Sequence, residues 1–185
     1  MNNEKDGLTK GLAHDYVKLI EEKIGFKFKI VKVSSFDEIL LLAQHGGVAI
    51  VNAVTKTPER SEYLLFTEPM VEIRNAILVR KNTVSRITLA DLSGKRVSLV
   101  KGYAITEYIE KNYPEIICDL VSSDLNAILN VSYRISDAAV IDLATSSYLT
   151  EKEGISNIQV AGDSGYPVKL AIGSRKDWPE LNSIL

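Results

Sequence analysis

Cysteine and histidine are scarce in this chain of 185 residues, which has one cysteine and two histidines. A single cysteine excludes an internal disulfide and any cysteine-rich metal site. His14 and His45 form no HExxH motif and no paired-histidine ligand set. The sequence therefore predicts no zinc site, no other metal and no cofactor. We interpret Cys118, inside the apolar run 116–120, as a small buried side chain of a strand.

An excess of one charge and long apolar runs are also missing. The net charge is -2 and the lysines and arginines are scattered, so we expect no nucleic-acid partner. The longest apolar runs fall far short of the ~20 residues that cross a bilayer, which predicts no membrane span. Residues 1–7 are polar and charged, so the sequence shows no secretory signal. With 45% apolar and 25% charged residues, the composition is that of an ordinary globular protein.

Helical and strand patterns alternate along the first part of the chain. Apolar residues repeat at helical spacing over 12–24, and Gly25 ends that predicted helix. Residues 26–33 alternate apolar and basic side chains, which predicts a strand with one exposed face. Ser35 and Glu38 have the spacing of a capping box at the start of the next helix. This order of elements predicts a parallel sheet with right-handed crossovers.

A second α/β unit is predicted after residue 80. Its expected elements are a capped turn at 88–92, strands at 96–100, 117–121 and 138–141, and helices that begin at Gly102, at Asp124 and after residue 141. Chain crossings are expected at Lys81–Thr83 and at a turn over Gly162–Gly165, before a returning strand at 168–173. The sequence thus predicts two lobes, 1–80 plus 166–185 and 81–165, with a ligand cleft at the hinge.

The segment Thr55–Arg60 has the clearest chemical implication. The run Val48–Val51 predicts a buried strand, and Thr57 and Pro58 suit the N-cap and first position of a following helix. Arg60 then lies at the C-terminal edge of a sheet, where open α/β folds bind ligands. Its planar guanidinium can bind a carboxylate through two parallel hydrogen bonds. The alternative is a surface ion pair of Arg60 with Glu59, Glu62 or Glu68.

Taken together, these motifs resemble the extracellular solute-binding proteins of the polar amino acid family, family 3. The segments that carry the resemblance are Gly11–Asp15, Thr55–Arg60, Phe66–Pro69, Asp91–Lys95, Lys101–Gly102 and Asp137–Asp142. The chain is especially similar to members that serve as sensory input domains of membrane-bound histidine kinases. The resemblance implies the two-lobed type II periplasmic-binding-protein fold (Venus flytrap), an α/β fold, and a periplasmic or extracytoplasmic location. It also implies a small-molecule ligand, either an amino acid or a small carboxylate, and a membrane-embedded kinase or permease as partner.

In the first lobe, the resemblance makes Arg60 the partner of the ligand α-carboxylate. Thr55 would assist through its backbone N–H and its hydroxyl, and Ala53 would offer its carbonyl to the ligand ammonium. Phe36 matches a position that often holds an aromatic residue of the pocket wall, although a lone aromatic at helical spacing is more often a core residue.

In the second lobe, the resemblance makes Asp142 the carboxylate that binds the ligand ammonium. The residues agree, because an acid that follows the buried run 138–141 lies at the C-terminal edge of a strand. The alternative is that Asp142 only caps the next helix, and the two roles are compatible. Tyr103 and Ala104 occupy another turn from strand to helix, where backbone N–H groups suit an anion.

The chain also departs from the family pattern. Relatives begin with a strand upstream of the position of Gly11, and their last helix extends beyond that of Leu185, so we expect a chain truncated at both ends. The export signal is then expected outside these residues.

Two other functions compete with reversible solute binding. One is an enzyme similar to the cyclic-carboxylate dehydratases of this fold, with Glu68, Asp142 and Glu107 as candidate acids or bases; so few groups favour binding over catalysis. The other is an interaction module with a degenerate, non-binding cleft. Gly162–Gly165 is similar to the nucleophile segment of trypsin-like proteases, but no histidine stands in a matching context.

Overall fold

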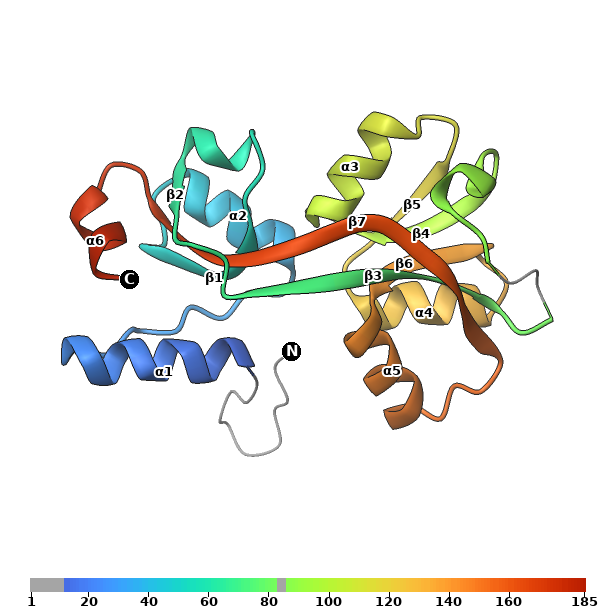
Figure 1. Ribbon diagram of the computed structural model, residues 1–185, viewed down its shortest axis with the longest axis horizontal. Helices are drawn as coiled ribbons and strands as arrows, with labels where there is room; N and C mark the ends of the chain where they lie inside the picture. The colour runs from blue at the N-terminus through green and yellow to red at the C-terminus, as the bar shows by residue number, and fades with distance from the viewer. Residues whose placement is uncertain (1–11, 83–85) are drawn as a thin grey trace. The chain divides into compact units, whose positions relative to one another are not determined.

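Residues 12–82 and 86–185 are described by the computed structural model (Figure 1). Contacts between residues divide the described chain into two compact units. The first comprises residues 12–34, 38–71 and 169–185, and the second comprises 35–37 and 72–168 without the undescribed positions. Both divisions near the predicted crossings fall inside long strands, β3 (Val71–Arg80) and β7 (Ile158–Arg175). The predicted lobe boundaries at 80/81 and 165/166 stay predictions.

The first unit is built on antiparallel pairs. Its elements are α1 (Leu12–Ile24), all of α2 (Phe36–Gln44) except its first two residues, β1 (Ile50–Thr55), the 3-10 turn η1 (Arg60–Glu62), β2 (Leu64–Phe66), the end of β7 and α6 (Pro179–Ile184). Both β1 and β2 pair antiparallel with β7. The helix predicted over 12–24 is confirmed, and Gly25 follows it with a φ of +73°, a left-handed conformation that glycine adopts without strain. The side chain of Leu12 lies outside the described part.

The strand predicted over 26–33 is absent, which corrects the expectation of a parallel sheet in this part of the chain. The segment has no strand assignment, and Phe26 and Ile30 are 75% and 61% exposed. Its alternating pattern suits a strand, but a strand exists only when another strand completes its hydrogen bonds. Here the backbone N–H of Phe28 donates to the side chain of Glu21 instead, at 2.7 Å.

The start of α2 carries hydrogen bonds one residue before the predicted capping box, which stays a prediction. The Glu38 carboxylate accepts hydrogen bonds from the backbone N–H and the hydroxyl of Ser34, at 2.8 and 2.7 Å. The capping geometry therefore involves Ser34, one residue before the predicted Ser35. Helix α2 itself is confirmed.

The second unit follows the predicted order of elements closely. After β3 come η2 (Leu89–Leu92), β4 (Arg96–Val100), α3 (Ala104–Asn112), β5 (Ile117–Val121), α4 (Asp124–Ser132), β6 (Ala138–Asp142) and α5 (Leu143–Lys152). The capped turn is confirmed, since Asp91 accepts from the N–H and hydroxyl of Thr88. Strand β4 is parallel to both β5 and β6, and β6 is antiparallel to β3. The parallel sheet thus lies in the second unit.

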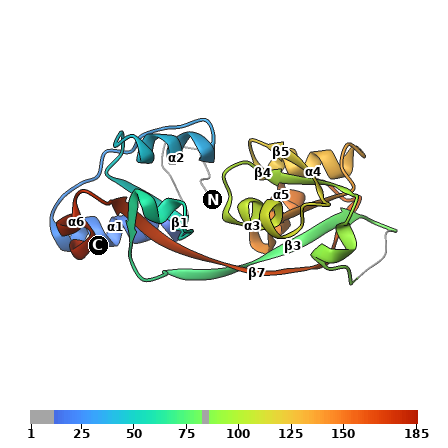
Figure 2. The ribbon, with the colours of Figure 1, turned by 90° about the horizontal axis from the view of Figure 1, so that it is seen from above.

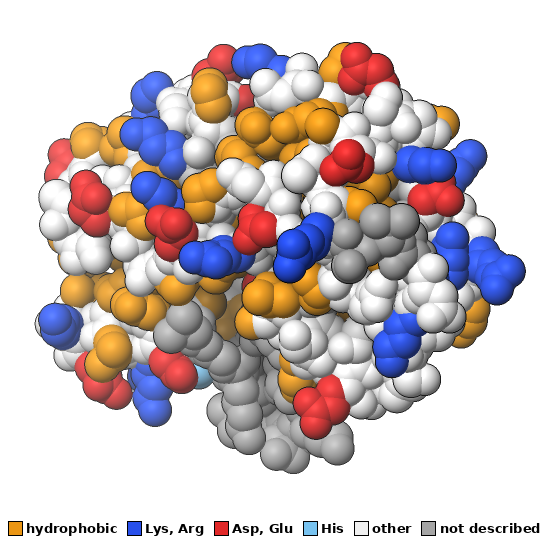
Figure 3. Space-filling model, turned by 45° about the vertical axis from the view of Figure 1, so that its right-hand side comes forward, with side chains coloured by type: hydrophobic (Ala, Val, Ile, Leu, Met, Phe, Trp, Pro, Cys, Tyr) orange, Lys and Arg blue, Asp and Glu red, His pale blue; other side chains and the backbone are white. Residues whose placement is uncertain are grey.

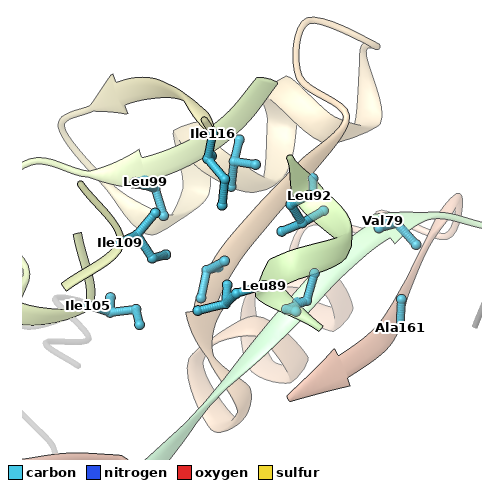
Figure 4. Close-up of a cluster of buried hydrophobic side chains, with 12 residues drawn as sticks. Val79, Leu89, Leu92, Leu99, Ile105, Ile109, Ile116 and Ala161 are labelled. Carbon is cyan, nitrogen blue, oxygen red and sulfur yellow. The ribbon is translucent and has the colours of Figure 1, made fainter. Parts of the chain in front are cut away.

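Both faces of this sheet are buried. Along β3, Ile77 and Val79 belong to one buried cluster, whereas Ala76 and Leu78 belong to the other. The first cluster packs against η2 and α3, where Leu89 and Ile109 meet the strands (Figure 4). The second packs against α4, which lies with α5 on the other side of the strands (Figure 1). Burial on both faces explains why 138–141 is a continuous apolar run.

The turn predicted over Gly162–Gly165 is wrong, because these residues lie inside β7. Figure 2 shows β7 continuing alongside β3 as an extended strand. The strand leaves no room for a side chain at Gly162, where a Cβ atom would lie 1.8 Å from the carbonyl oxygen of Ile87. The glycine therefore permits a close backbone approach rather than a turn. Thr83, the last residue of the other predicted crossing, lies outside the described part.

The surface shows no gathering of one charge on the face drawn in Figure 3, where acidic and basic side chains alternate. Within residues 12–82 and 86–185, no helix combines the length and apolarity needed to span a bilayer.

We predict that Gly162→Ala destabilises the protein by about 3 kcal/mol or more, because the added methyl group forces apart two backbone segments. The free energy of unfolding in urea measures this. Gly154→Ala is the control: nothing lies within 4 Å of its Cβ position, and its φ of +66° exposes the variant to backbone strain alone. Its expected cost is about 1 kcal/mol. Equal losses for both variants would contradict the close approach at Gly162.

Candidate functional site

The arginine turn of the first unit is organised around a buried guanidinium. Strand β1 ends at Thr55, and η1 begins at Arg60. The predicted α-helix after Thr57 is a single 3-10 turn, in which the Thr57 hydroxyl accepts the Arg60 N–H at 3.3 Å. The Arg60 side chain is only 2% exposed, and its Nη1 donates to the carbonyl oxygen of Thr55 at 2.9 Å. This burial argues against a surface ion pair for Arg60.

Ala53 has an unusual backbone conformation beside this turn. Its φ is +55°, although it is not a glycine, and it lies where the pairing of β1 with β7 shifts register between Val51 and Val54. Such a bulge redirects the backbone groups of one residue away from the ladder. The predicted role of the Ala53 carbonyl stays a prediction, but the geometry agrees with a specialised backbone position.

Asp142 of the second unit caps a helix. It is the last residue of β6, and its Oδ1 accepts the N–H groups of Ala144 and Thr145 at 2.7 and 3.2 Å. Its Oδ2 accepts the hydroxyl of Thr145 at 3.0 Å. The capping role is therefore observed. The predicted role in ligand binding is compatible with it, because a carboxylate has about four acceptor sites.

The turn between β4 and α3 carries Tyr103 and Ala104. Ala104 is the buried first residue of α3, one of the positions whose N–H has no acceptor within the helix. The ring of Phe36 meets the ring of Tyr103 edge-to-face, with centroids 5.2 Å apart. Next to this contact, Lys101 Nζ lies 2.9 Å from an oxygen of Asp37. Hydrogen bonds from Ser35 and Lys101 lower the pKa of the Asp37 carboxyl.

Asp124 is a residue of this region that the sequence reasoning missed as a candidate. It opens α4, immediately after the turn that follows β5, and its Oδ2 accepts the hydroxyl of Tyr103 at 3.1 Å. Burial raises the pKa of Tyr103, and the charges of Asp124 and Asp142 raise it further. The observation that supports Asp142, an acid at the carboxyl end of a strand of a parallel sheet, also applies to Asp124.

The predicted residues therefore form two groups. Ala53, Thr55 and Arg60 share one strand and turn in the first unit. The other group lies in the second unit and consists of Phe36, Tyr103, Ala104 and Asp142.

The candidate acids of the enzyme alternative come from both units. Glu68 is exposed in the first unit, whereas Glu107 lies in α3 and Asp142 caps α5 in the second. In the described residues, no cluster of His, Cys, Asp and Glu side chains has the makings of a metal site. An open pocket of about 630 Å³ lies beside the C-terminal ends of α4 and α5, and no predicted site residue lines it.

The fold and these two groups define a class of protein. An α/β chain in two units, with β4 parallel to β5 and β6 and long strands that run between the units, has the fold of the periplasmic-binding-protein type. A solved histidine kinase sensor domain with similarity to periplasmic binding proteins shares the fold. Its TM-score is 0.90 at 20% identity, and the match covers 98% of this chain and 79% of that one. The predicted fold class is confirmed.

The chain belongs to the bacterial extracellular solute-binding proteins, family 3, whose profile it matches over residues 1–185. It is 30% identical over 184 residues to the ABC transporter arginine-binding protein 1 of Escherichia coli, a match that covers 95% of this chain and 71% of that protein. It is 23% identical over 176 residues to the virulence sensor protein BvgS of Bordetella pertussis. That match covers 95% of this chain but 14% of BvgS. The resemblance and the extracytoplasmic location inferred from the sequence are confirmed.

We predict that Ala53→Gly stabilises the protein by up to about 1 kcal/mol, because glycine adopts a positive φ without the steric cost that an L-residue bears. Urea unfolding measures the change. Ala76→Gly is the matched control, since Ala76 is buried in β3 and has no positive φ. It should lose stability. A loss at Ala53 as large as that at Ala76 would show that the bulge is absent.

Proposed function

We propose that this chain binds a small zwitterionic solute, an amino acid, as the recognition part of an extracytoplasmic receptor. The observation that carries the proposal is the buried Arg60 at the end of β1 in a chain of this family. A guanidinium held by the Thr55 carbonyl is oriented before the ligand arrives, so less side-chain entropy is lost on binding. Its fork matches the two oxygens of an α-carboxylate.

The ligand ammonium is assigned to Asp142 of the second unit, and the carbonyl of Ala53 to a supporting role. A solute that binds one conformation of the chain more tightly than another shifts the equilibrium towards that conformation.

The energetics suit a solute receptor. Hydrogen bonds to charged groups contribute about 1.5 to 3 kcal/mol each. Four to six of them, as estimated from the charged ends of an amino acid, must offset an association cost of roughly 4 to 15 kcal/mol. A net binding free energy of about -8 kcal/mol corresponds to a Kd near the micromolar range.

The relatives support both the ligand class and the two possible outputs. The Escherichia coli relative is named as an arginine-binding protein of an ABC transporter, and BvgS is named as a virulence sensor. We therefore propose that the membrane partner of this chain is either a permease or a sensor kinase.

The capping and binding roles of Asp142 can be separated by two substitutions. Asparagine caps a helix about as well as aspartate but carries no charge. We predict that Asp142→Asn keeps the thermal stability of the free protein and lowers its affinity for the cognate amino acid by about 10-fold or more.

Asp142→Ala is the companion variant, and it should also lose about 1 kcal/mol of stability. A thermal-shift screen of the twenty amino acids, followed by calorimetry on each variant, measures both effects. Unchanged affinity in Asp142→Asn would restrict this residue to its capping role.

For Arg60, the informative substitution is lysine, because alanine would leave a cavity and an unpaired Thr55 carbonyl. We predict that Arg60→Lys weakens the binding of amino acids by about 10- to 100-fold, since lysine keeps the charge but loses the bidentate geometry. Exposed Arg74 of β3 provides the control, and Arg74→Lys should bind as the wild type does. If no amino acid or small carboxylate binds the wild type, the degenerate interaction module replaces the receptor.

A further inference from the structure

Three turns of the second unit meet at one edge of its sheet. Because β4 is parallel to both β5 and β6, the carboxyl ends of these three strands point the same way. Tyr103, Asp124 and Asp142 each lie within or just beyond the turn that follows one of these strands. This is the edge at which open α/β sheets bind ligands.

Asp124 differs from Asp142 in how its oxygens are used. Both oxygens of Asp142 accept hydrogen bonds from the first turn of α5. Asp124 Oδ2 accepts the Tyr103 hydroxyl, but its Oδ1 is buried and has no hydrogen-bond partner within the described part of the chain. Leaving a carboxylate oxygen buried and unpaired is costly, so a fold does not retain such a group for stability alone.

The electrostatic surroundings of Asp124 also disfavour a buried carboxylate without a partner. Burial raises the pKa of Asp124, and the nearby charge of Asp142 adds to that effect. A carboxyl group whose pKa is raised by burial and by a neighbouring carboxylate is stabilised in its charged form by a nearby cation. The Tyr103 hydroxyl holds Asp124 in place while leaving Oδ1 for a further donor.

We propose that Asp124 binds a second cationic group of the ligand, so that the solute is an amino acid with a guanidinium or ammonium side chain. The inference rests on the proposed function, in which Asp142 binds the α-ammonium. Asp124 then selects for the side chain, and Tyr103 positions Asp124. An uncharged side chain leaves Oδ1 with a weaker donor or none, which penalises neutral amino acids.

The first test is calorimetry with pairs of ligands that differ mainly in side-chain charge. Arginine is compared with citrulline, and lysine with glutamine. In the wild type, the cationic member of each pair should bind about 10- to 100-fold more tightly, as expected for one charge-assisted hydrogen bond. Asp124→Asn should remove most of this preference while changing the affinity for the neutral members less than about 3-fold, because the amide still accepts the Tyr103 hydroxyl.

Glu115→Gln is the matched control. Glu115 is exposed in the same unit, and this substitution removes one negative charge without touching the sheet edge. It should leave the preference for cationic ligands intact. If both variants lost the preference for cationic ligands equally, the net charge of the protein would explain the preference, and the assignment of Asp124 would be overturned.

A second readout does not need the ligand. For an acid whose pKa is raised on folding, the charged form is disfavoured in the folded state. The resulting loss of stability is complete above the folded pKa and disappears as the pH falls below the unfolded value. Asp124→Asn should therefore raise the melting temperature of the free protein at pH 7, and the gain over the wild type should shrink towards pH 4. A lower melting temperature at every pH would assign Asp124 a structural role and overturn the proposal.

The outcomes distinguish this inference from the proposed function. Tight binding of amino acids without any preference for cationic side chains overturns the role of Asp124 and leaves the receptor function standing. Binding of the diamine putrescine as tightly as lysine would overturn the assignment of the ligand carboxylate to Arg60 while supporting the second cation site. Failure of every amino acid and diamine to bind the wild type overturns both.

Discussion

The parallel pairing of β4 with β5 on one side and β6 on the other is the constraint on which the second unit depends. It sets the carboxyl ends of three strands at one edge, and it requires helices on both faces of the sheet to bury the apolar side chains. The two buried clusters show that the requirement is met, with α3 against one face and α4 against the other. One group of polar residues lies where the strands end, and it contains Tyr103, Asp124 and Asp142.

Charged side chains at the ends of strands are held in place here by local hydrogen bonds. Arg60 donates to the Thr55 carbonyl, and Asp142 accepts the first N–H groups of α5. In both cases the partner is backbone within a few residues, so the side chain is positioned by the turn that carries it. A receptor gains from this arrangement, because binding groups that are already ordered lose little entropy when the solute arrives.

Much of the fold could be predicted from short-range patterns. The helix over 12–24, the capped turn at Thr88 and the succession of strands and helices from 96 to 152 all agree with the sequence. The motif Thr55–Arg60 pointed to the arginine, and the family resemblance pointed to Asp142, whose place beyond a buried run agrees with that assignment. The same observation was not applied to Asp124, whose separation from β5 by two serines made it look like a helix start alone.

The sequence by itself determined the elements whose signals act within a few residues, because helical periodicity, capping and the conformational freedom of Gly25 are local properties. The tertiary structure alone decided whether residues 26–33 find a partner, whether Gly162–Gly165 bend or extend, and which carboxylate oxygen is left buried without a bond. Each of these depends on atoms supplied by segments distant in the sequence. Strand pairing and burial are properties of the whole assembly of segments, and no single stretch of residues encodes them.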